Sequence, residues 1–254
     1  MIGLGLTLTL GGGSSTLGGF SAEYQAIIAK ATALGYTLPS ASQQAKQNQL
    51  IIDLKTNGAW SRLDDFHMFR NDGSREFSTI NWIDPNNLAT GTFPTFSSAY
   101  GFQGDGSNMF LNLNTSGQIK FTLNSGAYGV YIENLGGAIQ TNRVFIGANN
   151  TNNRIRYNTA TINGVAVGTI PNAAPQKHWM INKNGTACTL YANGTSQATA
   201  TGTGTAETGS FNVFRYADLA SFGLGQISIA YKGSEMSSLA SSFDTIIRNY
   251  ITSL

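Results

Sequence analysis

Cysteine is almost absent from this chain of 254 residues. Cys188 is the single cysteine, so no disulfide can form within the chain, and cysteine content leaves the redox compartment undetermined. It lies in a strand-like segment between Ala187 and Thr189. We therefore expect a small buried side chain rather than a reactive thiol.

Charged residues are also scarce, at 11% of the chain, whereas ordinary soluble domains contain about 25%. The formal net charge is +2, and the basic residues form no stripe of the kind that binds nucleic acid. A run of about 18 apolar residues, which a membrane-spanning helix needs, is missing. The sequence therefore predicts neither a nucleic-acid partner nor a membrane partner.

The first 19 residues are predicted to be an extended arm. Leucines alternate with Gly and Thr, and a glycine- and serine-rich stretch follows. The segment lacks the basic start of a signal peptide, so we expect it to be retained. A lone strand cannot offset its ordering entropy, so we expect it to extend the sheet of a neighbouring subunit, with pairing to its own domain as the alternative. The arm residues expected to make this contact are Leu4, Leu6, Leu8 and Leu10.

A helical hairpin is predicted for residues 20–58. The first helix follows Ser21 and stops before Gly35, and the second follows Ser40 and stops at Gly58; these are typical cap residues. The apolar helix faces need a cover, either the following domain or a partner. We expect this hairpin to belong to the attachment region. Its expected attachment residues are Ile27, Ile28 and Leu34.

Residues 59–254 are predicted to form an antiparallel β-sandwich, or jelly roll, with a C-terminal helix. Residues 179–201 contain three short strands joined at Asn184-Gly185 and Asn193-Gly194, which are typical hairpin turns. Short strands separated by turn residues occupy the rest of this region. The clearest are residues 66–69, 127–133, 143–148, 154–157, 179–182, 188–192 and 226–231. Apolar residues from Met236 to Tyr250 then repeat with helical spacing.

Two runs in this region carry a resemblance to known families. The run from Trp179 through NGTACTLYANGTSQATAT, followed by FGLGQISIAYKGSEMSSLASSFDTIIRNYITSL, resembles the closing half of concanavalin A-like domains of the laminin-G and lectin type. The upstream run GAWSRLDDFHMFRNDGSREFSTINWIDPNNLATGTFPTFSSAYGFQGDGSNMFLNLNTS is similar to a segment of virion proteins of tailed phages, particularly those infecting Bacteroidetes. Together the two runs span roughly residues 58–253.

The resemblance implies a virion location and other virion proteins, such as capsid, portal or tail subunits, as partners through residues 1–58. It implies a capsid decoration, head fibre or tail-associated subunit. Fibres and decorations at symmetric viral positions are commonly homo-oligomers, so we expect a multimer, with a trimer favoured.

The sequence supplies no set of residues that commits it to catalysis. Concanavalin-like glycosidases carry a Glu-x-Asp-x-(x-)Glu run, and the chain has none. We therefore expect a non-enzymatic structural protein, with a glycan-binding module as the first alternative and a glycoside hydrolase as the second. Aromatic side chains stack on sugar rings. The tyrosines considered for glycan contact are Tyr157, Tyr191 and Tyr216.

No cofactor is expected. Asp72-Gly73 and Asp105-Gly106 are alternative oxygen donors for a calcium ion, although Asp-Gly is also a common turn pair. The two histidines have no second ligand at metal-binding spacing. The sequence therefore predicts no metal site, and calcium remains an alternative.

Overall fold

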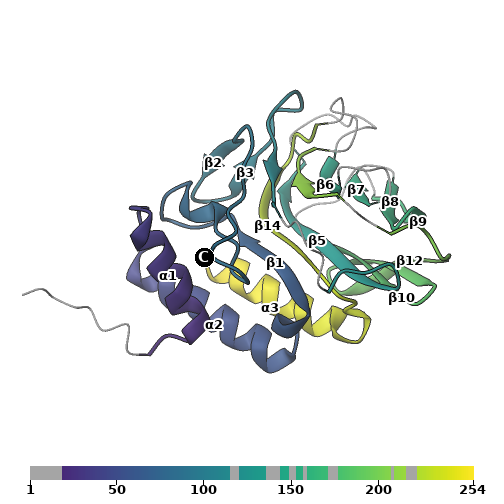
Figure 1. The fold of residues 1–254 in the computed structure, drawn as a ribbon, viewed down its shortest axis with the longest axis horizontal. Helices are drawn as coiled ribbons and strands as arrows, with labels where there is room; N and C mark the ends of the chain where they lie inside the picture. The colour runs from purple at the N-terminus through teal and green to yellow at the C-terminus, as the bar shows by residue number, and fades with distance from the viewer. Residues whose placement is uncertain are drawn as a thin grey trace, which may run out of the picture.

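The computed structural model describes residues 19–114, 120–135, 144–148, 153–156, 159–170, 177–206, 209–215 and 222–254. Figure 1 shows three layers: helices, a larger sheet and a smaller sheet. The predicted class, a mainly antiparallel β-sandwich with a helical hairpin and a C-terminal helix, is confirmed. The architecture agrees with the concanavalin A-like fold that the resemblance implied. The predicted arm lies outside the described residues except for Gly19.

The larger sheet has eight strands among the described residues. Its order is β12 (Thr195–Thr201), β11 (Ala187–Ala192), β10 (Lys177–Asn184), β5 (Ser125–Asn134), β14 (Gln226–Gly233), β3 (Gly101–Gln103) and β2 (Thr95–Ser97), and β1 (Leu63–Met68) also pairs with β14. All the pairings in this sheet are antiparallel.

The described part of the chain contributes six strands to the smaller sheet. Its order is β4 (Leu111–Asn112), β13 (Phe211–Val213), β6 (Val144–Ala148), β7 (Arg154–Arg156), β8 (Thr159–Ile162) and β9 (Val165–Gly168). Apolar side chains from the facing sides of the two sheets form the first core, with Phe145, Ile155, Trp179 and Leu190 among them. The hydroxyl of Tyr128 on β5 crosses this core and donates to the backbone oxygen of Thr161 on β8.

Three α-helices cover the outer face of the larger sheet: α1 (Ala22–Ala33), α2 (Ala41–Asn57) and α3 (Ala240–Ser253). Three short 3-10 helices, η1 (Trp60–Arg62), η2 (Phe77–Thr79) and η3 (Ser237–Leu239), connect elements. The predicted caps are confirmed: Ser21 Oγ accepts from Tyr24 N, and Ser40 Oγ accepts from Gln43 N, each at 3.3 Å. Gly58 ends α2 in the left-handed conformation, with φ 83°. None of the described helices is long and apolar enough to cross a membrane.

The second core lies between these helices and the larger sheet. Ile27 of α1, Leu54 of α2 and Phe243 of α3 are fully buried there together with Tyr231 of β14. The cover that the helix faces required is therefore supplied by the β domain of the same chain.

Both predicted hairpin turns are present, and one of them is shifted by one residue. Asn193 and Gly194 both adopt positive φ, at 48° and 72°, between β11 and β12, as a two-residue hairpin turn requires. The expected Asn184-Gly185 turn is instead Gly185-Thr186, because Asn184 remains in the ladder opposite Ala187. Only Gly185 of these residues needs a positive φ, at 61°, which glycine adopts without steric cost.

Candidate functional site

The outer face of the smaller sheet is the sheet face that the three α-helices do not cover (Figure 1). Ile155 of β7 points into the first core, so its neighbours Arg154 and Arg156 point outward, because side chains alternate along a strand. By the same reasoning Thr159 and Thr161 of β8 face outward, since Ala160 and Ile162 are core residues.

Strand register aligns these outward residues in a row. Asn112 of β4 is opposite Asn212 of β13, and Asn212 is opposite Gly147 of β6. Gly147 is opposite Arg154, and Arg154 is opposite Thr161. We call the row Asn112, Asn212, Gly147, Arg154 and Thr161 the polar row. Arg156 lies one pleat away on β7, opposite Thr159.

The polar row combines groups that suit neutral or acidic polyhydroxy ligands. Asparagine amides donate and accept hydrogen bonds, and a guanidinium donates in a planar fork that fits carboxylates or paired hydroxyls. Arg154 and Arg156 are half-buried, whereas Asn212 and Thr161 are buried. None of the six strands of this sheet contains an aspartate or glutamate, so they offer no carboxylate for acid or base chemistry.

The described carboxylates are engaged by groups of the same chain. Glu207 and Asp218 lie outside the described residues. The ion pairs are Glu23–Lys55, Arg62–Glu235, Asp65–Lys232, Arg70–Glu133, Arg75–Glu76 and Asp244–Arg248. The remaining carboxylates, Asp53, Asp64, Asp72, Asp84 and Asp105, accept hydrogen bonds. Glycosidases need two carboxyl groups facing one substrate site, and this part of the chain places none in the polar row.

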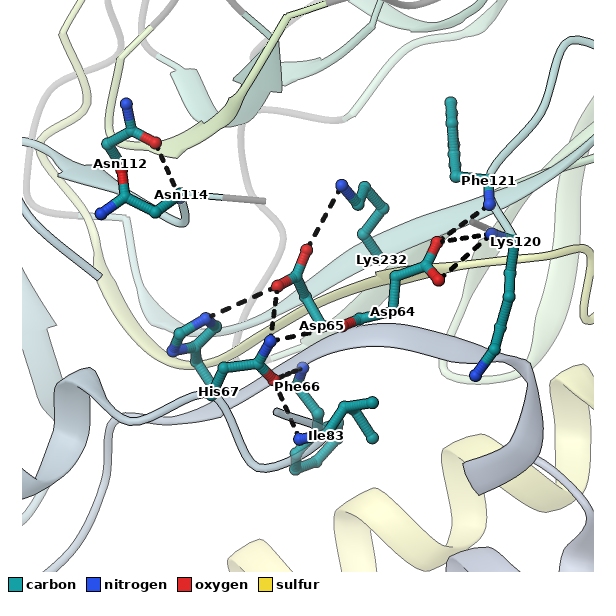
Figure 2. Close-up of polar contacts among 11 residues, drawn as sticks. Asp64, Asp65, Phe66, His67, Ile83, Asn112, Asn114, Lys120, Phe121 and Lys232 are labelled. Atoms are coloured by element: carbon teal, nitrogen blue, oxygen red, sulfur yellow. Dashed lines mark hydrogen bonds and ion pairs between the residues drawn. The ribbon is translucent and has the colours of Figure 1, made fainter. Parts of the chain in front are cut away.

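A buried charged cluster lies on the inner face of β1 and β14, and Figure 2 shows it at close range. Asp65 Oδ2 lies 3.3 Å from Lys232 Nζ, and both side chains are fully buried. Asn81 Nδ2 donates to Asp65 Oδ1 at 2.9 Å. His67 Nε2 lies 4.0 Å from that oxygen. Burial, and then the nearby Lys232 charge, lower the pKa of His67 to about 3, so the ring is neutral at ordinary pH.

A second polar cluster joins α3 to the helix side of the larger sheet. The ring of His178 on β10 contacts Asp244 Oδ1 at 3.0 Å and the Tyr231 hydroxyl at 2.7 Å. Arg248 Nε donates to the other oxygen of Asp244 at 2.7 Å. Burial, and then the Asp244 charge, raise the pKa of Tyr231 well above its ordinary value. Tyr231, His178 and Asp244 are all buried, so this cluster anchors the helix rather than meeting a ligand.

The residues that the sequence predicted for attachment differ in their exposure. Ile27 and Ile28 are buried against their own chain, with relative exposures of 0% and 4%. This corrects the expectation that they contact another protein, because the larger sheet and the other helices already occupy that surface. Leu34, at 41% exposure, stays accessible. The arm residues Leu4, Leu6, Leu8 and Leu10 lie outside the described residues.

The proposed glycan-contact tyrosines do not come together among the described residues. Tyr191 of β11 packs against the second core, on the helix side of the larger sheet. Tyr157 and Tyr216 lie outside the described residues. Sequence reasoning missed Arg154, Arg156 and Asn212. The Arg-Ile-Arg alternation of β7 was the available signal, but the pairing of β6 with both β7 and β13 could not be read from local sequence.

The two calcium alternatives are turns in this structure. Asp105 Oδ1 accepts from the backbone nitrogens of Ser107, Asn108 and Met109 at 2.9–3.0 Å. Partial burial acts to raise the pKa of Asp105, but these bonds and the Ser107 hydroxyl outweigh it and lower the pKa. Asp72 Oδ1 accepts from Ser40 N at 2.9 Å, before α2. No group of three or more metal-ligating side chains occurs among the residues that the structure describes.

Comparison with known proteins gives structural likeness only. No family model and no curated protein matches the sequence. Domain 4 of AbnA, a GH43 extracellular arabinanase from Geobacillus stearothermophilus solved with arabinotriose, is 12% identical, with a TM-score of 0.40, and the match covers 72% of this chain and 98% of that domain. A Trypanosoma rangeli sialidase is 8% identical, with a TM-score of 0.46, over 82% of this chain and 39% of the sialidase. At these scores the likenesses carry no functional argument.

The buried neutral histidine predicts a pH dependence of stability. Between its ordinary pKa of 6.5 and about 3, the unfolded chain binds a proton at His67 that the folded chain does not. Stability is therefore present above pH 6.5 and is lost as the pH falls, with a slope of up to about 1.4 kcal/mol per pH unit. His67→Gln should reduce the slope of unfolding free energy against pH, measured by urea unfolding at several pH values. Equal slopes in the two proteins would show that folded His67 protonates normally.

Proposed function

We propose that this chain is a non-enzymatic subunit of a phage particle that presents the polar row of its sandwich to glycans. The observation that carries the glycan part is the alignment of Asn112, Asn212, Arg154 and Thr161 across a sheet face that the α-helices leave uncovered. The phage part is supported by the sequence resemblance over roughly residues 58–253.

A binding role fits this face better than a hydrolytic one. Hydrolysis of a glycosidic bond needs a proton donor and a nucleophile or base, supplied by two carboxyl groups about 5–10 Å apart. The described strands of this sheet carry amides, hydroxyls and guanidinium groups instead. Such groups give modest affinity per site, and several copies on one particle would strengthen attachment through avidity.

The packing of the helices on the larger sheet also supports a role in which the chain presents the polar row. With α1, α2 and α3 sealed against the larger sheet, the helices complete the domain instead of offering their apolar faces to a partner. Attachment then falls to residues 1–19 and to exposed groups such as Leu34. This arrangement would leave the opposite side of the sandwich to the polar row, of which Asn112 and Arg154 are partly exposed.

Removing a guanidinium from the sheet face should weaken glycan binding. We expect Arg154→Ala to lower affinity for the best glycans of an array by about tenfold, the loss expected for one charge-assisted hydrogen bond. Arg75→Ala is the matched control, since Arg75 is exposed and pairs with Glu76 away from this sheet. Unchanged binding by a folded Arg154→Ala protein, or turnover of a bound glycan in a reducing-sugar assay, would contradict the proposal.

Deleting residues 1–19 should separate folding from particle incorporation. The truncated chain keeps α1 and both cores, so it should stay folded with a similar melting temperature. It should no longer join the particle, because the alternating leucines supply the contact. A full-length chain with serine at positions 4, 6, 8 and 10 is the matched control for length and should fail in the same way. Incorporation of either protein at the normal level would refute the attachment role.

A further inference from the structure

Asp65 and Lys232 form a charged pair in a place where an ion pair is costly. They are direct partners across β1 and β14, and their side-chain exposures are both 0%. Removing two charges from water costs several kcal/mol per ion, which their attraction only partly returns. Conversion to a neutral link would remove this cost.

We propose that the side chains of Asp65 and Lys232 join in an isopeptide bond that the folded chain forms by itself. Lys232 Nζ already lies 3.3 Å from Asp65 Oδ2, so the attacking nitrogen is held in contact with the carboxyl group whose carbon it would attack, and such positioning lowers the barrier to reaction. Figure 2 shows the two side chains pointing toward each other from neighbouring strands.

The surroundings of the pair are largely apolar. Lys232 Nζ lies 5.1 Å from the ring centre of Phe211. That ring packs against Phe121 and Tyr128, with centroid distances of 5.4 and 5.1 Å. Transfer of one proton from Nζ to Oδ2 within the pair gives the neutral amine, which is the nucleophile, and the carboxylic acid.

Two neighbours are placed to assist the step. Asn81 Nδ2 donates to Asp65 Oδ1 at 2.9 Å, so it would stabilise negative charge that develops on that oxygen. His67 Nε2 lies 4.0 Å from the same oxygen, and neither His67 ring nitrogen has a hydrogen-bond partner among the described residues. The His67 ring is neutral, so one of its nitrogens carries a lone pair near this oxygen.

The reaction balances without any oxidant or co-reactant. In the neutral pair, Nζ attacks Cγ of Asp65, and the new bond is N–C. The nitrogen of the tetrahedral adduct releases one proton, which His67 accepts and returns to Oδ2. The C–Oδ2 bond then breaks, and that oxygen leaves as water. The products are one secondary amide and one water molecule, and both buried charges disappear.

The bond would connect the beginning and the end of the β domain. β1 follows the helical hairpin, and β14 precedes α3. A covalent link between them closes a long loop of chain and limits the unfolded state, as a disulfide does in secreted proteins. The chain has only Cys188 and so cannot form an internal disulfide. A covalent link of this kind would stabilise a subunit that is exposed on a particle.

Intact mass spectrometry of the full chain tests the proposal directly. The wild-type mass should be lower than the sequence mass by one water molecule, and a protease digest should contain a branched peptide that joins Asp65 to Lys232. Lys232→Met should restore the full mass. Lys183→Met is the control: Lys183 is also buried, but its amine donates to the backbone oxygen of Gly202, so this variant should keep the deficit.

The wild-type measurement stands even if Lys232→Met fails to fold. A full sequence mass with no branched peptide would show an ion pair only and overturn the proposal. For the relay role, a folded His67→Gln protein should contain a smaller linked fraction than wild type. An unchanged linked fraction would show that His67 takes no part in the reaction, but it would not contradict the isopeptide bond. None of these readouts depends on glycan binding.

Discussion

The larger sheet has no solvent face along its centre, and this constraint shapes the rest of the molecule. Nearly every residue of β5 and β14 is buried, because the helices cover one face and the smaller sheet covers the other. Alternate residues therefore serve two cores: Tyr128 and Val130 enter the first, and Tyr131 and Ile229 enter the second. Where the β14 ladder is irregular, other residues supply a partner: the backbone oxygen of Ser228 accepts from the backbone nitrogens of Phe69 and Arg70, as burial requires.

The same constraint explains why polar side chains inside the sheet occur in matched groups. Asp65 faces Lys232 and Asn81 on the inner side. His178 faces Asp244 and Tyr231 on the helix side. Glu133, whose pKa is raised by burial and only partly lowered by Arg70, contacts that arginine at 3.3 Å. A buried charge without such a partner would cost several kcal/mol, so these groups fix the strand register and the docking of α3.

The surface that we propose for glycan binding lies on the smaller sheet, whose outer face the helices do not cover. The outer face of the smaller sheet needs no apolar pattern, and its strands carry Arg, Asn and Thr there. The assembly and recognition roles therefore need not compete for one surface. The helix layer closes the domain, and the opposite sheet face carries the polar row.

Much of the fold could be predicted from local sequence, because caps and turns are local. Ser21, Ser40 and Gly58 marked the helix ends correctly, and Asn193-Gly194 marked a hairpin. The packing of Ile27 could not be predicted in the same way, because an apolar helix face shows that a cover is needed but not which chain supplies it.

The polar row and the Asp65–Lys232 pair could not be predicted from local sequence. Their members come from strands that are far apart in sequence, and only the sheet register brings them together. Asp65 was visible as one of two adjacent acidic residues. Its partner on the last strand became identifiable only once β1 was seen to pair with β14.

We expect the helices and the sandwich to unfold as one unit around the larger sheet. Native-state hydrogen exchange, measured by mass spectrometry over peptides from α1, α2, β5 and β14, can show this. The slowest amides of the helices and of the two strands should open with the same free energy, because they share the second core. Exchange of α1 and α2 at a much lower free energy than β5 and β14 would contradict it and would make the hairpin a separate appendage.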